Sequence, residues 1–298
     1  MNAILTILTP TYNRAPELGK LYHSLVQQSK RDFTWFIMDD GSTDDTETIV
    51  QEYIKHGDIE IVYKKKENGG KHTALNTAIA QIDSELVFIV DSDDILTEDA
   101  VCQIYDYHDK YKNIPGLCGY SFLRINKQGQ YMHSGSLSSP EYVDSFVRGR
   151  INGKTPGDMA EVWYVRRLKE YPFPEFPKEK FLGEDVVWIK MSGPYNIVFI
   201  EKTIYICDYL DAGLTKNRRK HNVRSPKGCV LRAKVYLSEK TPFVYIVKSS
   251  LQYIVYGIFA GYPIRQLFLE CPRKIWFTLM LIPGCMIYFW WRELYLRD

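Results

Sequence analysis

The first third of the chain alternates between short apolar runs and helical patterns, and this alternation restricts the possible folds more than any other feature. Four runs have strand character: Ala3–Leu8, Phe33–Met38, Ile59–Tyr63 and Leu86–Val90. Polar loops and helical patterns follow the first three, and these patterns end near Gln28, His56 and Ile82. Such alternation predicts parallel strands joined by right-handed crossovers, so the loops after all four strands emerge at one edge of an α/β sheet.

The fourth strand brings three carboxylates, Asp91, Asp93 and Asp94, to that edge, where open α/β sheets bind ligands. Clustered carboxylates repel one another and suit a hard divalent cation, since Mg²⁺ takes one or two carboxylates together with phosphate oxygens. We therefore expect a metal and diphosphate site. The alternative is an Asx-rich turn in which Asp94 caps a helix that begins near Thr97.

Two other loops carry side chains that suit a nucleoside. Tyr12 offers a ring on which a base can stack, and Asp39 or Asp40 offers an acceptor for an imide N–H such as that of uracil. The alternatives are an ordinary loop aromatic and a helix N-cap that the two aspartates share with Ser42 or Thr43.

The loop after the third strand has features of an anion site. Gly69 and Gly70 permit backbone conformations that are closed to other residues, and Lys71 adds positive charge at a helix N-terminus. No Walker-type sequence and no G-x-G-x-x-G is present, which argues against kinase-like and dinucleotide chemistry.

The polar segments form an ordered set of motifs. They are Thr9-Pro-Thr-Tyr-Asn-Arg14, Asp39-Asp-Gly-Ser-Thr-Asp44, Asn68-Gly-Gly-Lys71 with Asn76, Asp91-Ser-Asp93-Asp94 and Gly183-Glu-Asp185. This set resembles that of the family 2 glycosyltransferases of bacterial surface-polysaccharide synthesis, which are inverting enzymes with the glycosyltransferase A-type (GT-A) fold. The resemblance covers about the first two hundred residues and implies a Rossmann-like fold, with a mostly parallel central sheet, flanking helices and a C-terminal helical appendage.

The resemblance also implies roles for individual residues. Asp91 would lie near the ribose, and Asp93 would ligate the Mn²⁺ or Mg²⁺ that bridges the diphosphate. A second metal ligand would be His221, for which a solvated loop histidine is the alternative. The nucleotide-sugar site as a whole would consist of Pro10, Thr11, Tyr12, Arg14, Asp39, Asp40, Asn68, Gly70, Lys71, Asp91 and Ser92.

The motif with Glu184 and Asp185 is the candidate for general-base catalysis. Inverting displacement of a nucleoside diphosphate needs a base on the face opposite the leaving group, and a positioned carboxylate suffices because the metal assists departure. These two residues follow a Gly turn and precede the apolar run 186–189, so they begin a helix. The alternative is that they only cap it. With the resemblance, Asp185 is the expected base and Glu184 its neighbour.

The stretch between the nucleotide half and the base is expected to extend the sheet with Gly119–Ile125 and Gly157–Val165. Trp163 and Tyr164 either stack on a sugar or pack in the core, and Asp158 is a weak candidate for an acceptor contact. The Pro-rich stretch 171–177 is expected to be an extended loop beside the site.

Three segments are expected: a catalytic domain at 1–211, a basic flexible connector at 212–240 and an apolar helical tail at 241–298. The catalytic domain comprises a nucleotide half, 1–95, and an acceptor half, 96–211. Ala212–Leu237 contains eight Lys or Arg and no acidic residue, which suits a mobile loop over a diphosphate or attachment to an anionic membrane.

The tail contains two uncharged stretches, Ser249–Ile264 and Ile275–Trp291, each shorter than the roughly twenty residues that cross a bilayer. Their aromatic residues and basic flanks are typical of a segment lying in the headgroup plane. The alternative is a helical pair buried on the catalytic domain or at a homodimer interface.

The global composition agrees with a cytoplasmic enzyme at the inner face of the plasma membrane. The formal net charge of +2 gives no reason to invoke nucleic acid, and six scattered cysteines without a C-x-x-C pair indicate neither a zinc site nor a disulfide framework. The N-terminus lacks the basic segment of a signal peptide.

The interpretation that results is a metal-dependent inverting transfer of a sugar from a nucleotide sugar, in particular a UDP-sugar, to a saccharide or lipid-linked acceptor. The two alternatives are a nucleotidyltransferase and a non-catalytic sugar- or membrane-binding module. The loop Thr9–Arg14 lacks the Gly- and Lys-rich character of the first, and the presence of Asp91, Asp93 and Asp185 argues against the second.

Overall fold

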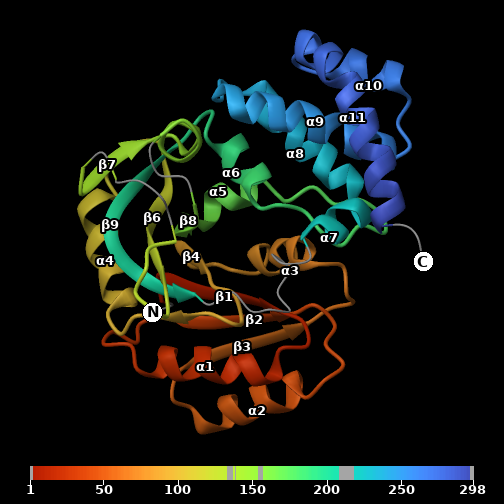
Figure 1. Ribbon diagram of the computed structural model, residues 1–298. Helices are drawn as coiled ribbons and strands as arrows, with labels where there is room; N and C mark the ends of the chain where they lie inside the picture. Colours follow the sequence, from red (N-terminus) through yellow and green to blue (C-terminus); the bar gives the residue numbers. More distant parts are fainter. Residues whose placement is uncertain (1–2, 133–136, 138, 154–156, 208–217, 296–298) are drawn as a thin grey trace. The chain divides into compact units, whose positions relative to one another are not determined.

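A computed structural model of the chain describes residues 3–132, 137, 139–153, 157–207 and 218–295 (Figure 1). The chain divides into two compact units. The first unit comprises Met1–Pro172 with Met191–Asp208, and the second comprises Phe173–Lys190 with Tyr209–Asp298. Each unit has a hydrophobic core. The expected boundary at residue 211 lies outside the described residues.

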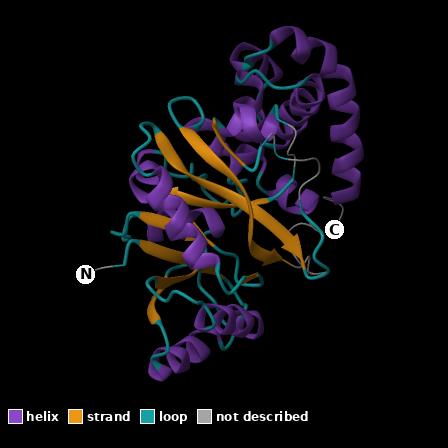
Figure 2. Ribbon diagram, turned by 90° about the vertical axis from the view of Figure 1, so that its left-hand side faces the viewer, coloured by secondary structure: helices purple, strands orange, loops and turns teal. Residues whose placement is uncertain are grey.

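The first unit is built on one mixed sheet with the strand order β3–β2–β1–β4–β8–β6–β9–β5, and β7 pairs with β9. The strands are β1 (Leu5–Thr11), β2 (Thr34–Asp39), β3 (Glu60–Lys65), β4 (Leu86–Ile89), β5 (Ile95–Leu96), β6 (Leu117–Asn126), β7 (Glu141–Asp144), β8 (Met159–Tyr164) and β9 (Asn196–Cys207). Figure 2 shows these strands twisting relative to one another.

The expected α/β fold is confirmed, and the parallel pairing is concentrated where the sequence predicted it. β1 pairs in parallel with β2 and β4, and β2 with β3. Farther along, β8 enters antiparallel between β4 and β6, while β6 and β9 are again parallel. Both stretches that were expected to extend the sheet, Gly119–Ile125 and Gly157–Val165, supply strands, β6 and β8.

Helices cover both faces of the parallel strands. They are α1 (Ala15–Val26), α2 (Thr46–His56), α3 (Lys71–Ile79), α4 (Ala100–Tyr111) and α5 (Val165–Glu170), with a short π-helix at Val147–Ile151. α1 and α2 lie on one face and α3 on the other (Figure 1). Because strand residues alternate between faces, Leu5 and Ile7 join the core cluster beneath α1 and α4.

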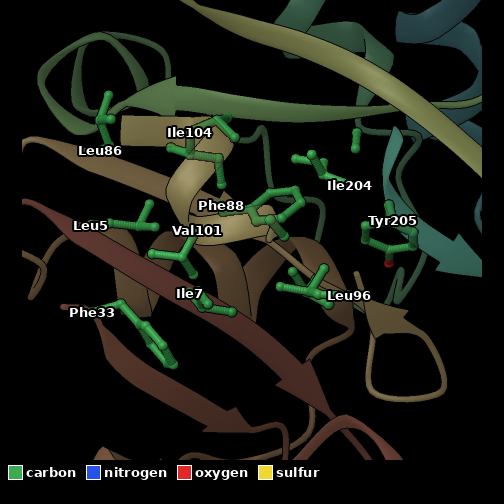
Figure 3. Packing of buried hydrophobic residues seen from close by; sticks show 14 of the residues in the cluster. Leu5, Ile7, Phe33, Leu86, Phe88, Leu96, Val101, Ile104, Ile204 and Tyr205 are labelled. Carbon is green, nitrogen blue, oxygen red and sulfur yellow. The ribbon is translucent and has the colours of Figure 1, made fainter. Parts of the chain in front are cut away.

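That core cluster is shown in Figure 3, where Phe88 of β4 lies among Val101 and Ile104 of α4 and Tyr205 of β9. The rings of Phe88 and Tyr205 meet edge to face with 6.0 Å between their centroids. Residues from the first and last strands of the unit thus share one core.

The first strand continues three residues beyond the predicted end at Leu8, because Thr9, Pro10 and Thr11 stay in register with β2. The Leu8 carbonyl accepts from Val90 of the β4 side, and the Thr11 carbonyl accepts from Asp40 on the β2 side. Because successive residues of a strand direct their backbone groups to opposite sides, the backbone nitrogen of Pro10 points toward β4, where the pairing of β1 with β4 has already ended at Ile89. Its missing N–H therefore costs no ladder hydrogen bond, and the predicted loop start at Thr9 is wrong.

The second unit consists of α6 (Asp185–Met191, whose last residue belongs to the first unit), α7 (Arg218–Arg224), α8 (Pro226–Ser238), α9 (Phe243–Phe259), α10 (Ile264–Glu270) and α11 (Lys274–Tyr295). From residue 218 onward, the expectation of a flexible connector at 212–240 is wrong. Pro226 opens α8 at its first turn, and Val230, Ala233 and Leu237 bury one apolar stripe against α9.

The last helix, α11, spans 22 residues and is longer than the uncharged stretch Ile275–Trp291, because the helix also includes charged residues on both sides of that stretch. Among the described helices it is the one long and apolar enough to cross a bilayer by length and composition. Only 11% of its apolar window is buried in the structure. One side packs on α9, where a Cβ on Gly284 would come within 2.7 Å of Ile254.

Candidate active site

Hydrogen bonds connect the loops after β1, β2, β3 and β4 at the carboxyl edge of the sheet, as the sequence predicted. Asn13 donates its backbone N–H to Ser42 Oγ at 2.9 Å and joins the first two loops. Asp40 joins the second loop to the third, and Lys71 Nζ reaches Asp91 Oδ1 of the fourth at 2.5 Å. The predicted motifs from four separate segments therefore form one cluster.

Asp40 organises the loop at 66–70. Its Oδ1 accepts from Lys66 Nζ at 2.9 Å and from the Gly69 N–H at 3.0 Å, and its Oδ2 accepts from Asn68 Nδ2 at 3.1 Å and the Gly70 N–H at 2.7 Å. Gly70 has φ +95°, a left-handed conformation that favours glycine. The carboxylate is only 3% exposed, so in this structure it shapes the loop that carries Lys71.

Asp39 is fully buried and fixes its own loop against β3. It accepts from the Ser42 N–H at 2.7 Å and from the Tyr63 hydroxyl at 2.6 Å. Burial first, and then the hydrogen bond to Asp39, raise the pKa of Tyr63. Because α2 begins at Thr46 after Asp45, the alternative in which Asp39 or Asp40 caps that helix is wrong.

The end of β1 presents the groups that suit a nucleoside. The Tyr12 side chain is 46% exposed, whereas Thr11 is buried and its hydroxyl has no hydrogen-bond partner among the described residues. Pro10 and Thr11 are the last two residues of β1, and Arg14 immediately precedes α1. A buried orphan hydroxyl beside an exposed ring is an arrangement that a bound polar ring satisfies.

The acidic loop after β4 combines carboxylates of different character. Burial would raise the pKa of Asp91, but the charges of Lys71 and Arg124 lower it overall. For Asp93, burial and then the neighbouring Asp91 charge raise the pKa, and the same two causes raise the pKa of Asp94 to about 7. Ser92 lies buried between them.

Tyr205 of β9 fixes the shape of this loop, and sequence reasoning missed it. Its hydroxyl donates to Asp94 Oδ2 at 2.6 Å and accepts from the Asp91 N–H at 3.1 Å. The guanidinium of Arg124 lies over its ring, 4.0 Å from the centroid. Since β5 follows the loop and α4 begins only at Ala100, the alternative in which Asp94 caps a helix is wrong.

The donor set fits a divalent cation that arrives with a diphosphate. No group of three His, Cys, Asp or Glu side chains within the described part of the chain is arranged to hold a metal by itself. Mg²⁺ and Mn²⁺ sites of nucleotide enzymes use one or two carboxylates and complete their shell with phosphate oxygens and water. Asp94 is buried and accepts from Tyr205, whereas Asp93 is half-buried, so Asp93 is the more accessible of these two carboxylates.

In the second unit, Asp185 is the first residue of α6, and its carboxylate is held by α8. Arg232 donates from Nε to Oδ1 at 2.8 Å and to Oδ2 at 2.9 Å, and Tyr236 donates to Oδ2 at 2.7 Å. Burial alone would lower the pKa of Arg232, but the Asp185 charge outweighs it and raises that pKa. Glu184 precedes Asp185 in the turn before the helix.

The structure also locates the other candidate residues, His221, Trp163 and Tyr164. His221 lies half-buried in α7 of the second unit, 6.3 Å from Phe181 between ring centroids, whereas Asp93 belongs to the first unit. Burial and then the charges of Arg224 and Lys220 lower the pKa of His221. Trp163 and Tyr164 are each 1% exposed, so they pack in the core and do not stack on a sugar.

Two further expectations concern the surroundings of the site. Asp158 is exposed, and its backbone N–H donates to the Met132 carbonyl. The Pro-rich stretch 171–177 is a loop, as predicted, and Phe173 within it packs edge to face on Trp188 at 5.7 Å between ring centroids.

The GT-A fold of nucleotide-sugar transferases is the class that this sheet and its acidic edge define. The family model for glycosyl transferase family 2 matches residues 6–161, which include all four loops of the cluster. The chain belongs to this family, as the motifs predicted.

Curated relatives agree with that assignment. A Campylobacter jejuni GalNAc(5)-diNAcBac-PP-undecaprenol beta-1,3-glucosyltransferase is 28% identical over 211 residues, which cover 68% of this chain and 62% of that protein. The Staphylococcus aureus poly(ribitol-phosphate) beta-N-acetylglucosaminyltransferase TarS is 32% identical over 109 residues, 35% of this chain and 19% of TarS. The chain thus matches less than two thirds of the length of these relatives.

Two solved structures share the fold. The crystal structure of S. aureus TarS 1-349 in complex with UDP-GlcNAc has a TM-score of 0.61, 17% identity and coverage of 97% of this chain and 91% of that one. The mannosyltransferase PcManGT from Pyrobaculum calidifontis, in complex with GDP-Man and Mn²⁺, has a TM-score of 0.56, 19% identity and coverage of 96% and 87%.

Proposed function

We propose that the protein transfers a sugar, with inversion, from a UDP-sugar to a saccharide or lipid-linked saccharide in the synthesis of a bacterial surface polysaccharide. The observation that carries the proposal is the cluster of four loops with an exposed ring, an orphaned buried hydroxyl and an acidic turn. The family model covers this whole cluster, and the fold neighbour bound to UDP-GlcNAc supports a UDP-linked donor.

Within the donor site, Tyr12 stacks on the uracil ring and the Thr11 hydroxyl gains its missing partner from the nucleoside. Asp39 and Asp40 are buried and bonded to protein donors, and they hold the surrounding loops in shape. Lys71 sits at the N-terminus of α3, where the helix dipole favours the diphosphate, and it balances Asp91 near the ribose.

The proposed cofactor is Mn²⁺ or Mg²⁺, and Asp93 is its proposed protein ligand. The neighbour in complex with Mn²⁺ supports a divalent cation in this fold. When bound, such a cation stabilises the negative charge that develops on the departing diphosphate.

Asp185 is the proposed general base, with Glu184 beside it. It removes the proton from the acceptor hydroxyl while that oxygen attacks the anomeric carbon from the face opposite the diphosphate. Arg232 and Tyr236 hold this carboxylate in place by hydrogen bonds.

We further propose that the acceptor is lipid-linked and that the enzyme works on the inner face of the plasma membrane. The name of the C. jejuni relative includes an undecaprenol-linked glycan. In this chain, Ile275, Ile282 and Met286 project from α11 with 76%, 74% and 68% of their surface exposed. Residues 209–298 contain fifteen Lys or Arg and five Asp or Glu, which suits contact with anionic lipid.

The test of the donor proposal is calorimetric titration of the protein with UDP, GDP, ADP and their sugars, with Mn²⁺ or Mg²⁺ and with chelator. We expect UDP to bind more tightly than GDP and ADP, and Tyr12→Ala to weaken all UDP compounds. Asp93→Asn is expected to remove the dependence on metal. Binding of no nucleotide under any condition, with folding intact by circular dichroism, would overturn the proposed function.

A further inference from the structure

Three residues spaced one helical turn apart on α8, namely Gly228, Arg232 and Tyr236, contact the segment 179–185 that leads into α6. Residues at i, i+4 and i+8 share one face of a helix. All of these residues belong to the second unit. One face of α8 therefore contacts the segment that ends at Asp185, the proposed base.

The first contact fixes the start of that segment. Glu179 is 9% exposed and accepts the backbone N–H groups of Lys227 and Gly228, both at 2.9 Å, in the first turn of α8. A carboxylate at this position satisfies orphan amide groups and interacts favourably with the helix dipole. At Gly228 the backbones approach so closely that a Cβ would lie 3.0 Å from the Phe181 carbonyl oxygen.

The second contact fixes the end of the segment at Asp185. Arg232 holds both carboxylate oxygens, and Tyr236 adds a donor to Oδ2. The Asp185 and Arg232 side chains each keep 21% of their surface exposed. At Gly183 a Cβ would lie 2.8 Å from Asp185 Oδ1 and 3.1 Å from Arg232 Cδ, so any larger residue would push the pair apart.

This geometry suits the orientation of a base better than simple attachment of two helices. The planar guanidinium fork fixes the plane of a carboxylate, which the point charge of a lysine does not. An ion pair that loses water gains little net stability, so attachment alone gives a weak reason for it. A carboxylate base, in contrast, must meet the acceptor hydroxyl within hydrogen-bond reach and at a defined angle.

We propose that Arg232 and Tyr236 are positioning residues that hold Asp185 ionised and correctly oriented, so that α8 positions the catalytic base. The proposal rests on the role of Asp185 as base. In the transfer step the acceptor oxygen bonds to the anomeric carbon, the bond from that carbon to the diphosphate oxygen breaks, and the hydroxyl proton moves to the Asp185 carboxylate. Arg232 and Tyr236 stay protonated throughout. The Asp185 carboxylate is regenerated for the next turnover when its proton passes to water.

The experiment compares Arg232→Lys and Tyr236→Phe with wild type in steady-state transfer across a range of pH. Because each variant removes donors to a charged oxygen, we expect kcat to fall roughly 10- to 100-fold for Arg232→Lys and about 3- to 10-fold for Tyr236→Phe. KM for the donor is expected to stay within a factor of about two. The acidic limb of the pH–rate profile should move to higher pH, because the ionised carboxylate loses stabilisation.

Lys234→Gln on the same helix is the matched control, since Lys234 pairs with Glu270 outside this face. It is expected to leave kcat and the pH profile unchanged. Arg232→Lys or Tyr236→Phe with wild-type kcat and an unmoved acidic limb would overturn the proposal, as would an equal loss of kcat at every pH. If Arg232→Lys does not fold, Tyr236→Phe, which removes a single hydroxyl, decides the question.

Asp185→Asn separates this proposal from the proposed function. Full transfer activity in Asp185→Asn would refute Asp185 as base, whatever the α8 variants do. Loss of transfer in Asp185→Asn with unaltered UDP binding, together with wild-type behaviour of both α8 variants, would refute only the positioning role of Arg232 and Tyr236.

Discussion

Replacing Ile282 of α11 by serine is expected to weaken binding of the protein to anionic vesicles by roughly fivefold to thirtyfold. Full burial of an isoleucine side chain stabilises by about 1.5–3 kcal/mol. Because 74% of Ile282 is exposed in the structure, lipid can take up about three quarters of that value, or about 1–2 kcal/mol. At 1.4 kcal/mol per tenfold change, this energy sets the expected range.

The same calculation for Met286, which is 68% exposed, gives a similar energy, and the two sites lie one turn apart on the same exposed face. The double variant should therefore lose about 100-fold, if both residues enter the lipid together. Serine is preferred to glutamate because it removes the apolar contribution without adding charge repulsion.

The assay is co-sedimentation with vesicles of phosphatidylglycerol and of phosphatidylcholine, at low and high salt. Wild-type protein should bind the anionic vesicles more tightly, and salt should weaken this binding because the basic residues of the second unit act through screened charges. Ile54→Ser is the matched control, since Ile54 is a 37% exposed isoleucine on α2. Point substitutions are required because α9 and α11 complete the core around α8, so that deletion of 241–298 would also disturb α8.

Equal binding by Ile282→Ser and wild type, or no preference of the wild type for anionic vesicles, would refute the reasoning. A second copy of the chain is the competing occupant of this face. Sedimentation velocity would identify it as a dimer that Ile282→Ser dissociates. The excess of positive charge in residues 209–298 opposes such self-association and favours lipid.

Three further predictions concern the first unit. Asp40→Asn should weaken UDP binding and increase hydrogen exchange of the Gly70 amide, because loss of the charged acceptor costs about 3 kcal/mol; unchanged exchange would contradict this. Burial lowers the pKa of His108 below its ordinary 6.5, so the unfolded state binds more protons and the free energy of unfolding should fall as pH drops below 6.5; His108→Gln should lack this dependence in urea titrations at several pH values. Gly119→Ala should destabilise by about 3 kcal/mol or prevent folding, because its Cβ would lie 2.1 Å from the Val162 carbonyl oxygen; a wild-type melting temperature would refute the strand packing.

The parallel half of the sheet was predictable because its signals are local. Strand, loop and helix follow one another within a few tens of residues, and parallel connection brings every loop to one edge. The contacts of Asn13 with Ser42, of Asp40 with Gly70 and of Lys71 with Asp91 are consequences of that rule. A motif placed at a strand end was therefore placed correctly in space.

The contacts that were missed join residues far apart in the sequence. Arg232 lies 47 residues from Asp185 in the sequence. In the sequence alone, nothing distinguishes it from the other seven basic residues of Ala212–Leu237. Charge density alone predicts a loop here, but lysine and arginine are good helix formers and an apolar stripe runs through the same segment. The insertion of β8 between β4 and β6 has no local signal either, because antiparallel neighbours are set by packing across the whole sheet.

Tyr205 has a consequence for the order in which the protein becomes functional during synthesis. It follows Asp94 by 111 residues and Asp91 by 114, and it fixes both. At about 5–20 residues per second, a ribosome needs roughly 6–20 seconds to add that length of chain. During this interval the emerging parallel strands lack the tyrosine that fixes their acidic loop. Given the proposed role of this loop in donor binding, we expect the nascent protein to reach its full affinity for donor only when β9 joins the sheet. A chain that stalls before residue 205 is expected to fold around an incomplete site.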